Sequence, residues 1–182
     1  MFLYQTVQFK RVRTITSKLL TIAQQQNVEL KSTMQFDTGL LDDQVPELVE
    51  QFNDMGLKVQ IFREFISMPN QGIHVHQDGS EQNPKHLAIN WPIKNCTGTY
   101  MCWWEYRDLP IIESVFYDPI DKNKTPHNFY SQDTATKIGE CEIVTPTLVN
   151  INQYHSVQNT NAVRRMISFR FEQEPFNLIY DK

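Results

Sequence analysis

Residues 73–79 read IHVHQDG, and residues 148–171 read LVNINQYHSVQNTNAVRRMISFRF. In the first stretch His76 and Asp78 are two positions apart, so on an extended strand their side chains point to the same side. The second stretch contains His155. Two histidines and one carboxylate are the ligand set of a non-haem Fe(II) facial triad, which leaves other coordination positions open. The two stretches therefore indicate an iron site made of His76, Asp78 and His155.

Arg165 follows His155 by ten positions and lies in a run that alternates like a strand. If 163–171 is a strand, Arg165 shares its face with Ile167, Phe169 and Phe171, whereas Arg164, Met166 and Arg170 face the other way. We expect the apolar face to point into the interior of the β-structure. A buried guanidinium there needs an anionic partner, because an unpaired buried charge is very costly. A carboxylate bound through two hydrogen bonds is the natural partner.

This order of HxD, a distant His and an Arg ten residues beyond it resembles the 2-oxoglutarate/Fe(II) dioxygenases. IHVHQDG, LAINWPIKNC and the 148–171 stretch resemble the aspartyl/asparaginyl-hydroxylase-like and prolyl-hydroxylase-like branches, over roughly residues 57–171. The resemblance implies that His76, Asp78 and His155 bind Fe(II), that Arg165 binds the distal carboxylate of 2-oxoglutarate, and that Asn90 is a second candidate for this cosubstrate. It also implies hydroxylation of a peptidyl side chain or a small molecule, with 2-oxoglutarate decarboxylated to succinate.

The apolar patterns predict a mainly β fold preceded by helices. Stripes of apolar residues predict helices at 14–26 and 46–55, the second with Pro46 in its first turn and Gly56 as a stop. Strand-like runs occur at 5–12, 57–68, 86–93, 98–106, 111–117, 141–151 and 163–171. Residues 118–137 form the longest polar stretch, and we interpret them as a loop that is functional or mobile.

We predict a single domain over residues 1–182. It has an N-terminal strand and helical layer (1–56), a jelly-roll core (57–171) and a C-terminal tail (172–182). The expected fold is a double-stranded β-helix, a cupin-like jelly roll, with the N-terminal helices packed on its outside.

Two other functions fit a jelly roll. In a cupin-type metal site the ligands would be His74, His76, Glu81 and His155, since His74-x-His76 followed by Glu81 has the spacing of the first cupin motif. That hypothesis leaves the inward arginine without a role. A non-catalytic binding or structural protein is the third possibility, and only metal and cosubstrate binding would separate it from an enzyme.

The composition is that of a globular protein, with 40% hydrophobic and 21% charged residues in 182. A net charge of −4 gives no electrostatic footprint for nucleic acid. Three cysteines do not suggest a disulfide framework, and no apolar run suggests a secretion signal or a membrane span. We therefore expect a cytoplasmic protein with a small-molecule or peptidyl substrate, no nucleic-acid partner and no membrane partner. The substrate and the oligomeric state are not readable from the sequence.

Overall fold

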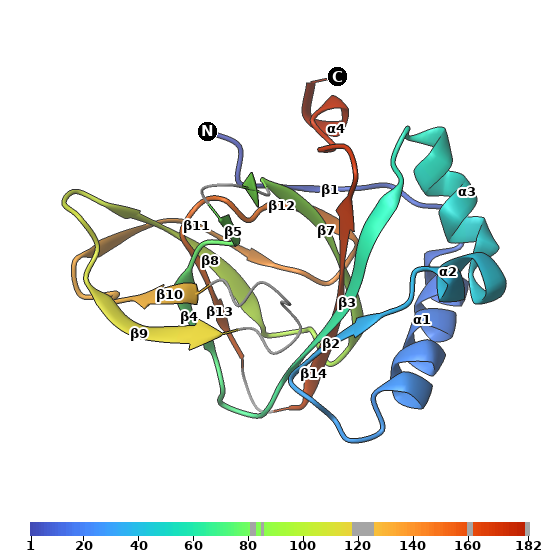
Figure 1. The fold of residues 1–182 in the computed structure, drawn as a ribbon, viewed down its shortest axis with the longest axis horizontal. Helices are drawn as coiled ribbons and strands as arrows, with labels where there is room; N and C mark the ends of the chain where they lie inside the picture. The colour runs from blue at the N-terminus through green and yellow to red at the C-terminus, as the bar shows by residue number, and fades with distance from the viewer. Residues whose placement is uncertain (81–82, 85, 118–125, 160–161, 181–182) are drawn as a thin grey trace.

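The strands form two antiparallel sheets that face each other, in a computed structural model that describes residues 1–80, 83–84, 86–117, 126–159 and 162–180 (Figure 1). The first sheet has the order β1 (Tyr4–Thr6), β12 (Thr147–Asn150), β7 (Leu87–Lys94), β14 (Arg164–Phe171), β3 (Val59–Ser67) and β2 (Thr33–Phe36). The second has the order β11 (Ala135–Glu142), β8 (Tyr100–Tyr106), β13 (His155–Gln158), β4 (Ile73–His76), β10 (Pro126–Tyr130) and β9 (Ile112–Tyr117). A short pair, β5 (Gly79–Ser80) and β6 (Asn83–Pro84), follows β4. The prediction of a mainly β fold is confirmed.

Helices cover the outer face of the first sheet, on the right of Figure 1. The helices are α1 (Val12–Gln26), α2 (Gly39–Gln44), α3 (Pro46–Asp54) and a C-terminal turn, α4 (Asn177–Tyr180). The two predicted helices correspond to α1 and α3, and α3 begins at Pro46 as expected. Gly56 follows α3 with φ of 71°, a conformation that glycine adopts without strain. The short α2 and the strand β2 were not predicted.

Both faces of β14 are buried, and this decides where its arginines point. All eight residues of β14 are buried. Phe169 and Phe171 pack edge-on against Phe52 of α3, each with ring centroids 5.1 Å apart. Met166, on the opposite face, belongs to the core between the two sheets. Arg165 lies on the Phe169 face, as its position predicts, but that face points toward the helices. The expectation that it points into the interior of the jelly roll is wrong.

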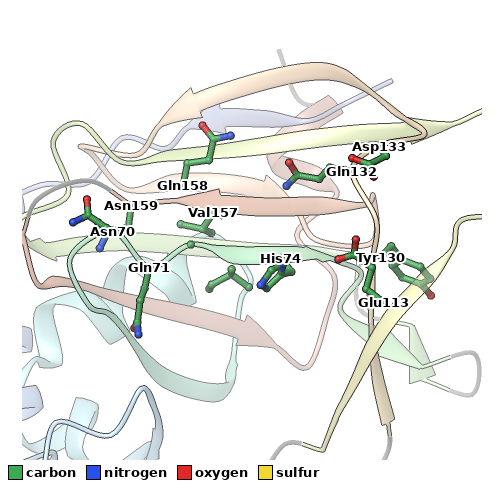
Figure 2. A pocket seen from close by; sticks show the side chains of 12 residues that line it. Asn70, Gln71, His74, Glu113, Tyr130, Gln132, Asp133, Val157, Gln158 and Asn159 are labelled. Carbon is green, nitrogen blue, oxygen red and sulfur yellow. The ribbon is translucent and has the colours of Figure 1, made fainter.

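The second sheet opens on one side of β4. β10 joins β4 through one ladder pair, Tyr130 with Val75, whereas it pairs with β9 along its whole length. An open groove of about 860 Å³ lies here, lined from one side by residues 70–74 and from others by Glu113 and the end of β13 (Figure 2). The groove therefore lies beside the stretch of chain that contains two of the predicted metal ligands, His76 and Asp78.

The predicted loop 118–137 is only partly a loop. Residues 118–125 lie outside the described part of the chain, but residues 126–130 and 135–142 form β10 and β11. The polar composition of this stretch concealed the two strands, in which the described side chains are partly buried or exposed. Among the described residues, no helix has the length and hydropathy to cross a lipid bilayer. Cytoplasmic location and the absence of a nucleic-acid partner stay predictions.

Candidate metal centre and adjoining cavity

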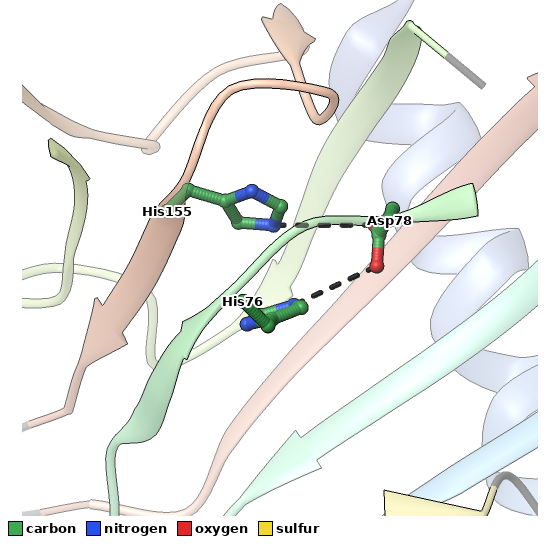
Figure 3. A group of neighbouring side chains, drawn as sticks. All are labelled: His76, Asp78 and His155. Carbon is green, nitrogen blue, oxygen red and sulfur yellow. Dashed lines mark ion pairs between the residues drawn. The ribbon is translucent and has the colours of Figure 1, made fainter. Parts of the chain in front are cut away.

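His76, Asp78 and His155 come together between the two sheets (Figure 3). Each offers one ligand atom, and these three atoms lie within 4.8 Å of one another. His76 ends β4, and His155 begins β13, directly opposite His76 in the ladder. Asp78 lies in the connection after β4, where its N–H donates to the Ile151 carbonyl at 2.9 Å. Among the described residues this is the group of side chains compact enough to hold one metal ion.

Main-chain carbonyls fix the orientation of both histidine rings. The Nδ1 atom of His76 lies 2.8 Å from the His74 carbonyl oxygen, and the Nδ1 atom of His155 lies 2.8 Å from the Gln153 carbonyl oxygen. A carbonyl oxygen only accepts, so each Nδ1 must carry the hydrogen. Each Nε2 atom is then the lone-pair nitrogen, and both Nε2 atoms lie toward Asp78, at 3.6 and 3.9 Å from its carboxylate oxygens. This is the arrangement of hydrogen bonds that commonly orients metal-binding histidines.

Charge and burial set the protonation states of Asp78 and His155. Burial alone would raise the pKa of the Asp78 carboxyl, but Arg170, His76 and His155 together lower that pKa well below its usual range. Burial is also the main reason that the pKa of His155 falls to about 3, with His76 adding to it. Asp78 is therefore ionised and His155 neutral at physiological pH, which are the protonation states that bind metal.

Arg170 holds the Asp78 carboxylate. Its Nη2 atom donates to Oδ2 of Asp78 at 2.8 Å, with both side chains largely buried. A charge-assisted hydrogen bond of this kind fixes the carboxylate in one orientation. Arg170 is on the face of β14 that points into the jelly roll, one of the positions that the sequence assigned to the outside.

A small cavity of about 60 Å³ extends from the metal ligands between the sheets. The cavity is lined on one side by Asn90 of β7 and, from β14, by Arg164, Met166 and Ser168. Asn90 and Ser168 are opposite each other in the β7–β14 ladder. Asn90 therefore brings a neutral hydrogen-bonding group into the same cavity as His76, Asp78 and His155, and its role toward a cosubstrate stays a prediction.

Arg164 is a buried cation without a carboxylate partner among the described residues. It is 4% exposed, and its Nε atom is buried and makes no hydrogen bond. Burial lowers the pKa of its guanidinium below the ordinary value, and the neighbouring Cys96 thiol offsets this only in part. A buried charge of this kind is costly unless an anion accompanies it. The position of Arg164 in the cavity wall marks this cavity as a place for an anion.

Arg165, the residue expected to bind the cosubstrate, lies elsewhere. Its Nε atom donates to Oε1 of the fully buried Glu64 at 2.6 Å, on the helix side of the sheet. The other carboxylate oxygen of Glu64 accepts from Asn27, the residue that ends α1, at 2.9 Å. Arg165 still has one buried nitrogen, Nη2, without a hydrogen bond, but its charge is compensated within the protein. Arg165 thus connects the sheet to α1 and does not line the cavity.

Sequence reasoning placed the three ligands and Asn90 around one cavity but missed Arg164 and Arg170. A sequence signal for these two residues existed. Arg164, Ser168 and Arg170 are separated by even numbers of positions, so they form one polar face of the strand. For the cupin hypothesis, His74 is exposed and does not join the metal-ligand group, and Glu81 lies outside the described residues.

Comparisons with known proteins identify the fold. No protein-family model matches this chain, and neither does any curated protein. Among solved structures, a prolyl-4-hydroxylase from Pseudomonas putida is similar with a TM-score of 0.52 and 11% identity, over 92% of this chain and 91% of its own. AviO1 from Streptomyces viridochromogenes (TM-score 0.46, 9% identity, 94% and 90% covered) and EvdMO1 (0.47, 13%, 94% and 47%) are also similar. The hydroxylase likeness shows the fold alone, and it confirms the predicted jelly roll.

Proposed function

We propose that this protein is an Fe(II)- and 2-oxoglutarate-dependent oxygenase that hydroxylates a C–H bond of its substrate. One observation carries the proposal: the His76–Asp78–His155 group opens onto a cavity whose wall contains the buried, unpaired Arg164. These features support the binding of a metal ion and of a ligand with an anionic group.

The donor set fits Fe(II). Two imidazoles and one carboxylate are the ligands of non-haem iron oxygenases, and they leave sites on the metal for other ligands. Arg170 keeps the carboxylate oriented, and the two main-chain carbonyls keep each Nε2 atom toward the metal. The contacts from Arg170 and from the two carbonyls are all present in this structure. The three side chains would therefore need little movement to bind a metal ion, which makes the centre preorganised.

The cavity fits one end of 2-oxoglutarate. Arg164 would pair with the carboxylate remote from the metal, and Asn90 and Ser168 would offer neutral hydrogen bonds between the two. When bound, iron and 2-oxoglutarate would supply the oxidation with dioxygen as the oxidant: 2-oxoglutarate would lose CO2 and take one oxygen atom to become succinate, and the other oxygen atom would go to the substrate. The residues of this chain would bind and orient them, and the methionines Met101 and Met166 would keep the cavity wall apolar.

Anaerobic titration of the protein with Fe(II) and then 2-oxoglutarate tests the proposal. We expect a weak visible charge-transfer band that requires both ligands and that is absent from Asp78→Ala. Admission of air should then release succinate. A protein that binds Fe(II) but gives no band and no heat on addition of 2-oxoglutarate would be a metal-binding jelly roll of another kind. Retention of iron by Asp78→Ala would favour the cupin hypothesis.

A further inference from the structure

A second cleft adjoins the group formed by His76 and Asp78. It has a volume of about 250 Å³ and shares five residues with the inner cavity, namely His76, Asp78, Arg170, Phe65 and Ile73. The buried Ile66 of β3 lines it together with three partly buried apolar side chains from three strands, Phe65 of β3, Ile73 of β4 and Phe129 of β10. The Phe129 ring lies across the ring of His76, with centroids 5.8 Å apart and planes at 70°.

Phe65, Ile73 and Phe129 are only partly buried although they line a concave surface. Partly exposed apolar groups around a cleft beside a reactive centre are typical of a ligand site. The apolar wall closest to the metal would therefore contact whatever part of the substrate approaches the metal.

The apolar wall of the cleft does not favour a charged reacting group. Among the described residues, the charged side chains that line it are Arg63, Asp78 and Arg170. Asp78 and Arg170 are paired with each other, and Arg63 donates to Gln35 at 3.2 Å. A carboxylate or carboxamide placed against Phe65, Ile73 and Phe129 would lose water without gaining hydrogen bonds from them. An aliphatic or aromatic group is favoured in the same position.

The cleft continues into the polar groove on the second sheet. Gln71, Gly72 and Ile73 line both the cleft and the groove. Gly72 is needed at this junction, because a Cβ atom there would lie 2.6 Å from the Val157 carbonyl oxygen. The groove, at about 860 Å³, contains mostly amide, carboxylate and hydroxyl side chains. A free amino acid in the cleft would make no contact along most of this groove.

We infer that the substrate is a polypeptide segment that places an apolar side chain in the cleft and extends its polar body along the groove. The inference rests on the proposed function and specifies its substrate class. A peptide suits the groove because β10 joins β4 through a single ladder pair, which leaves the sheet open beside Gly72 and Ile73. An extended chain can bind beside such an opening through its main chain while its side chains enter adjoining pockets.

Relaxation of probe protons by Mn(II) tests the inference without turnover. The protein is loaded with Mn(II) and 2-oxoglutarate, and both binding steps are first verified by calorimetry. The probes are two heptapeptides of Gly and Ser with a central Leu or Asp, and N-acetyl-leucine amide. We expect the Leu methyl protons to relax fastest, and the Leu heptapeptide to bind at least about tenfold tighter than either other probe.

Substitution of the cleft wall gives the matched comparison. Phe129→Ala should reduce the preference for the Leu over the Asp heptapeptide to less than about threefold. Phe176→Ala, which removes an exposed ring beside His86 near the C-terminus, should leave the preference unchanged.

Each other outcome has a definite meaning. Equal or tighter binding of the Asp heptapeptide to the wild-type protein would overturn the apolar assignment and leave the proposed function intact. Equal binding of N-acetyl-leucine amide and the Leu heptapeptide would overturn the role of the groove. No bound probe, with Mn(II) and 2-oxoglutarate bound, would overturn the whole inference. Failure of Mn(II) or 2-oxoglutarate to bind would remove the proposed function and the inference together.

Discussion

Arg164 and Arg165 are neighbours in sequence and equally buried, at 4% and 5% exposure, but they lie in opposite environments. Arg165 points toward the helical layer and meets the carboxylate of Glu64. Arg164 points between the sheets, where the described residues offer it no carboxylate and the Cys96 thiol lies beside it. A charge that is paired within the protein contributes to the fold, whereas a buried charge that lacks a partner marks a place for a ligand.

The same division runs along the whole of β14. Ile167, Phe169 and Phe171 follow Arg165 into the core beneath the helices, and Ser168 and Arg170 follow Arg164 into the cavity. One strand thus supplies the packing of the helical layer from one face and the polar groups of the candidate site from the other.

Loss of the metal is the largest effect that we expect. Asp78→Ala removes the only anionic ligand and leaves Arg170 unpaired beside two imidazoles, so Fe(II) and Mn(II) affinity should fall by more than about 100-fold. Metal content after reconstitution and dialysis measures this. Asp42→Ala, an exposed carboxylate on α2, is the control and should keep a full complement of metal. Stoichiometric metal in Asp78→Ala would place the metal on some other set of ligands.

The next largest effect that we expect is a loss of stability when the ion pair on the helix side of β14 is broken. Arg165→Met should lower the free energy of unfolding by about 3–5 kcal/mol, because it leaves the carboxylate of Glu64 buried without its cation. Urea denaturation measures the change, and Glu64→Gln combined with Arg165→Met should recover part of it. Arg164→Met is the matched variant and should unfold at the wild-type urea concentration or above it. If Arg164→Met is the more destabilised of the two, the assignment of their faces is reversed.

A smaller effect is expected from the residue that orients the carboxylate. Arg170→Met should weaken Mn(II) binding by about tenfold, since Asp78 keeps its charge but loses its orienting hydrogen bond. Arg170→Lys should restore part of the affinity, because a lysine can return one charge-assisted bond but not the planar fork. Arg13→Met on the exposed side of α1 provides the comparison. Metal affinity that is unchanged in Arg170→Met would mean that Asp78 is oriented by its main-chain anchor alone.

Local chemistry in the sequence was enough to find the three side chains that come together as the candidate metal centre. His76 and Asp78 are separated by the two-residue period of a strand, and the adjoining strand carries His155 opposite His76 in the ladder. The helices at α1 and α3 were also predictable, because their apolar stripes have the helical period and Pro46 marks a start.

The direction of β14 was not predictable from its own alternation. A strand with one buried face shows that face by its apolar residues, but β14 is buried on both faces, and the more apolar one packs on helices. The predicted helices could have shown which face of β14 is turned toward them. Apolar stripes on two helices require an apolar sheet face to cover, and Ile167, Phe169 and Phe171 provide it. The shared cavity of Asn90 and Arg164 depends on contacts between strands far apart in sequence, which no local pattern reveals.

The central claim is that Arg164, and not Arg165, binds the carboxylate of 2-oxoglutarate. Calorimetric titration of 2-oxoglutarate into Mn(II)-loaded wild-type, Arg164→Met and Arg165→Met proteins, well below their unfolding temperatures, tests it most directly. We predict that Arg164→Met binds 2-oxoglutarate at least about tenfold more weakly than wild type, a loss of roughly 1.4 kcal/mol or more, and that Arg165→Met binds it within about twofold of wild type. The reverse pattern, with weak binding in Arg165→Met and wild-type affinity in Arg164→Met, would contradict the account.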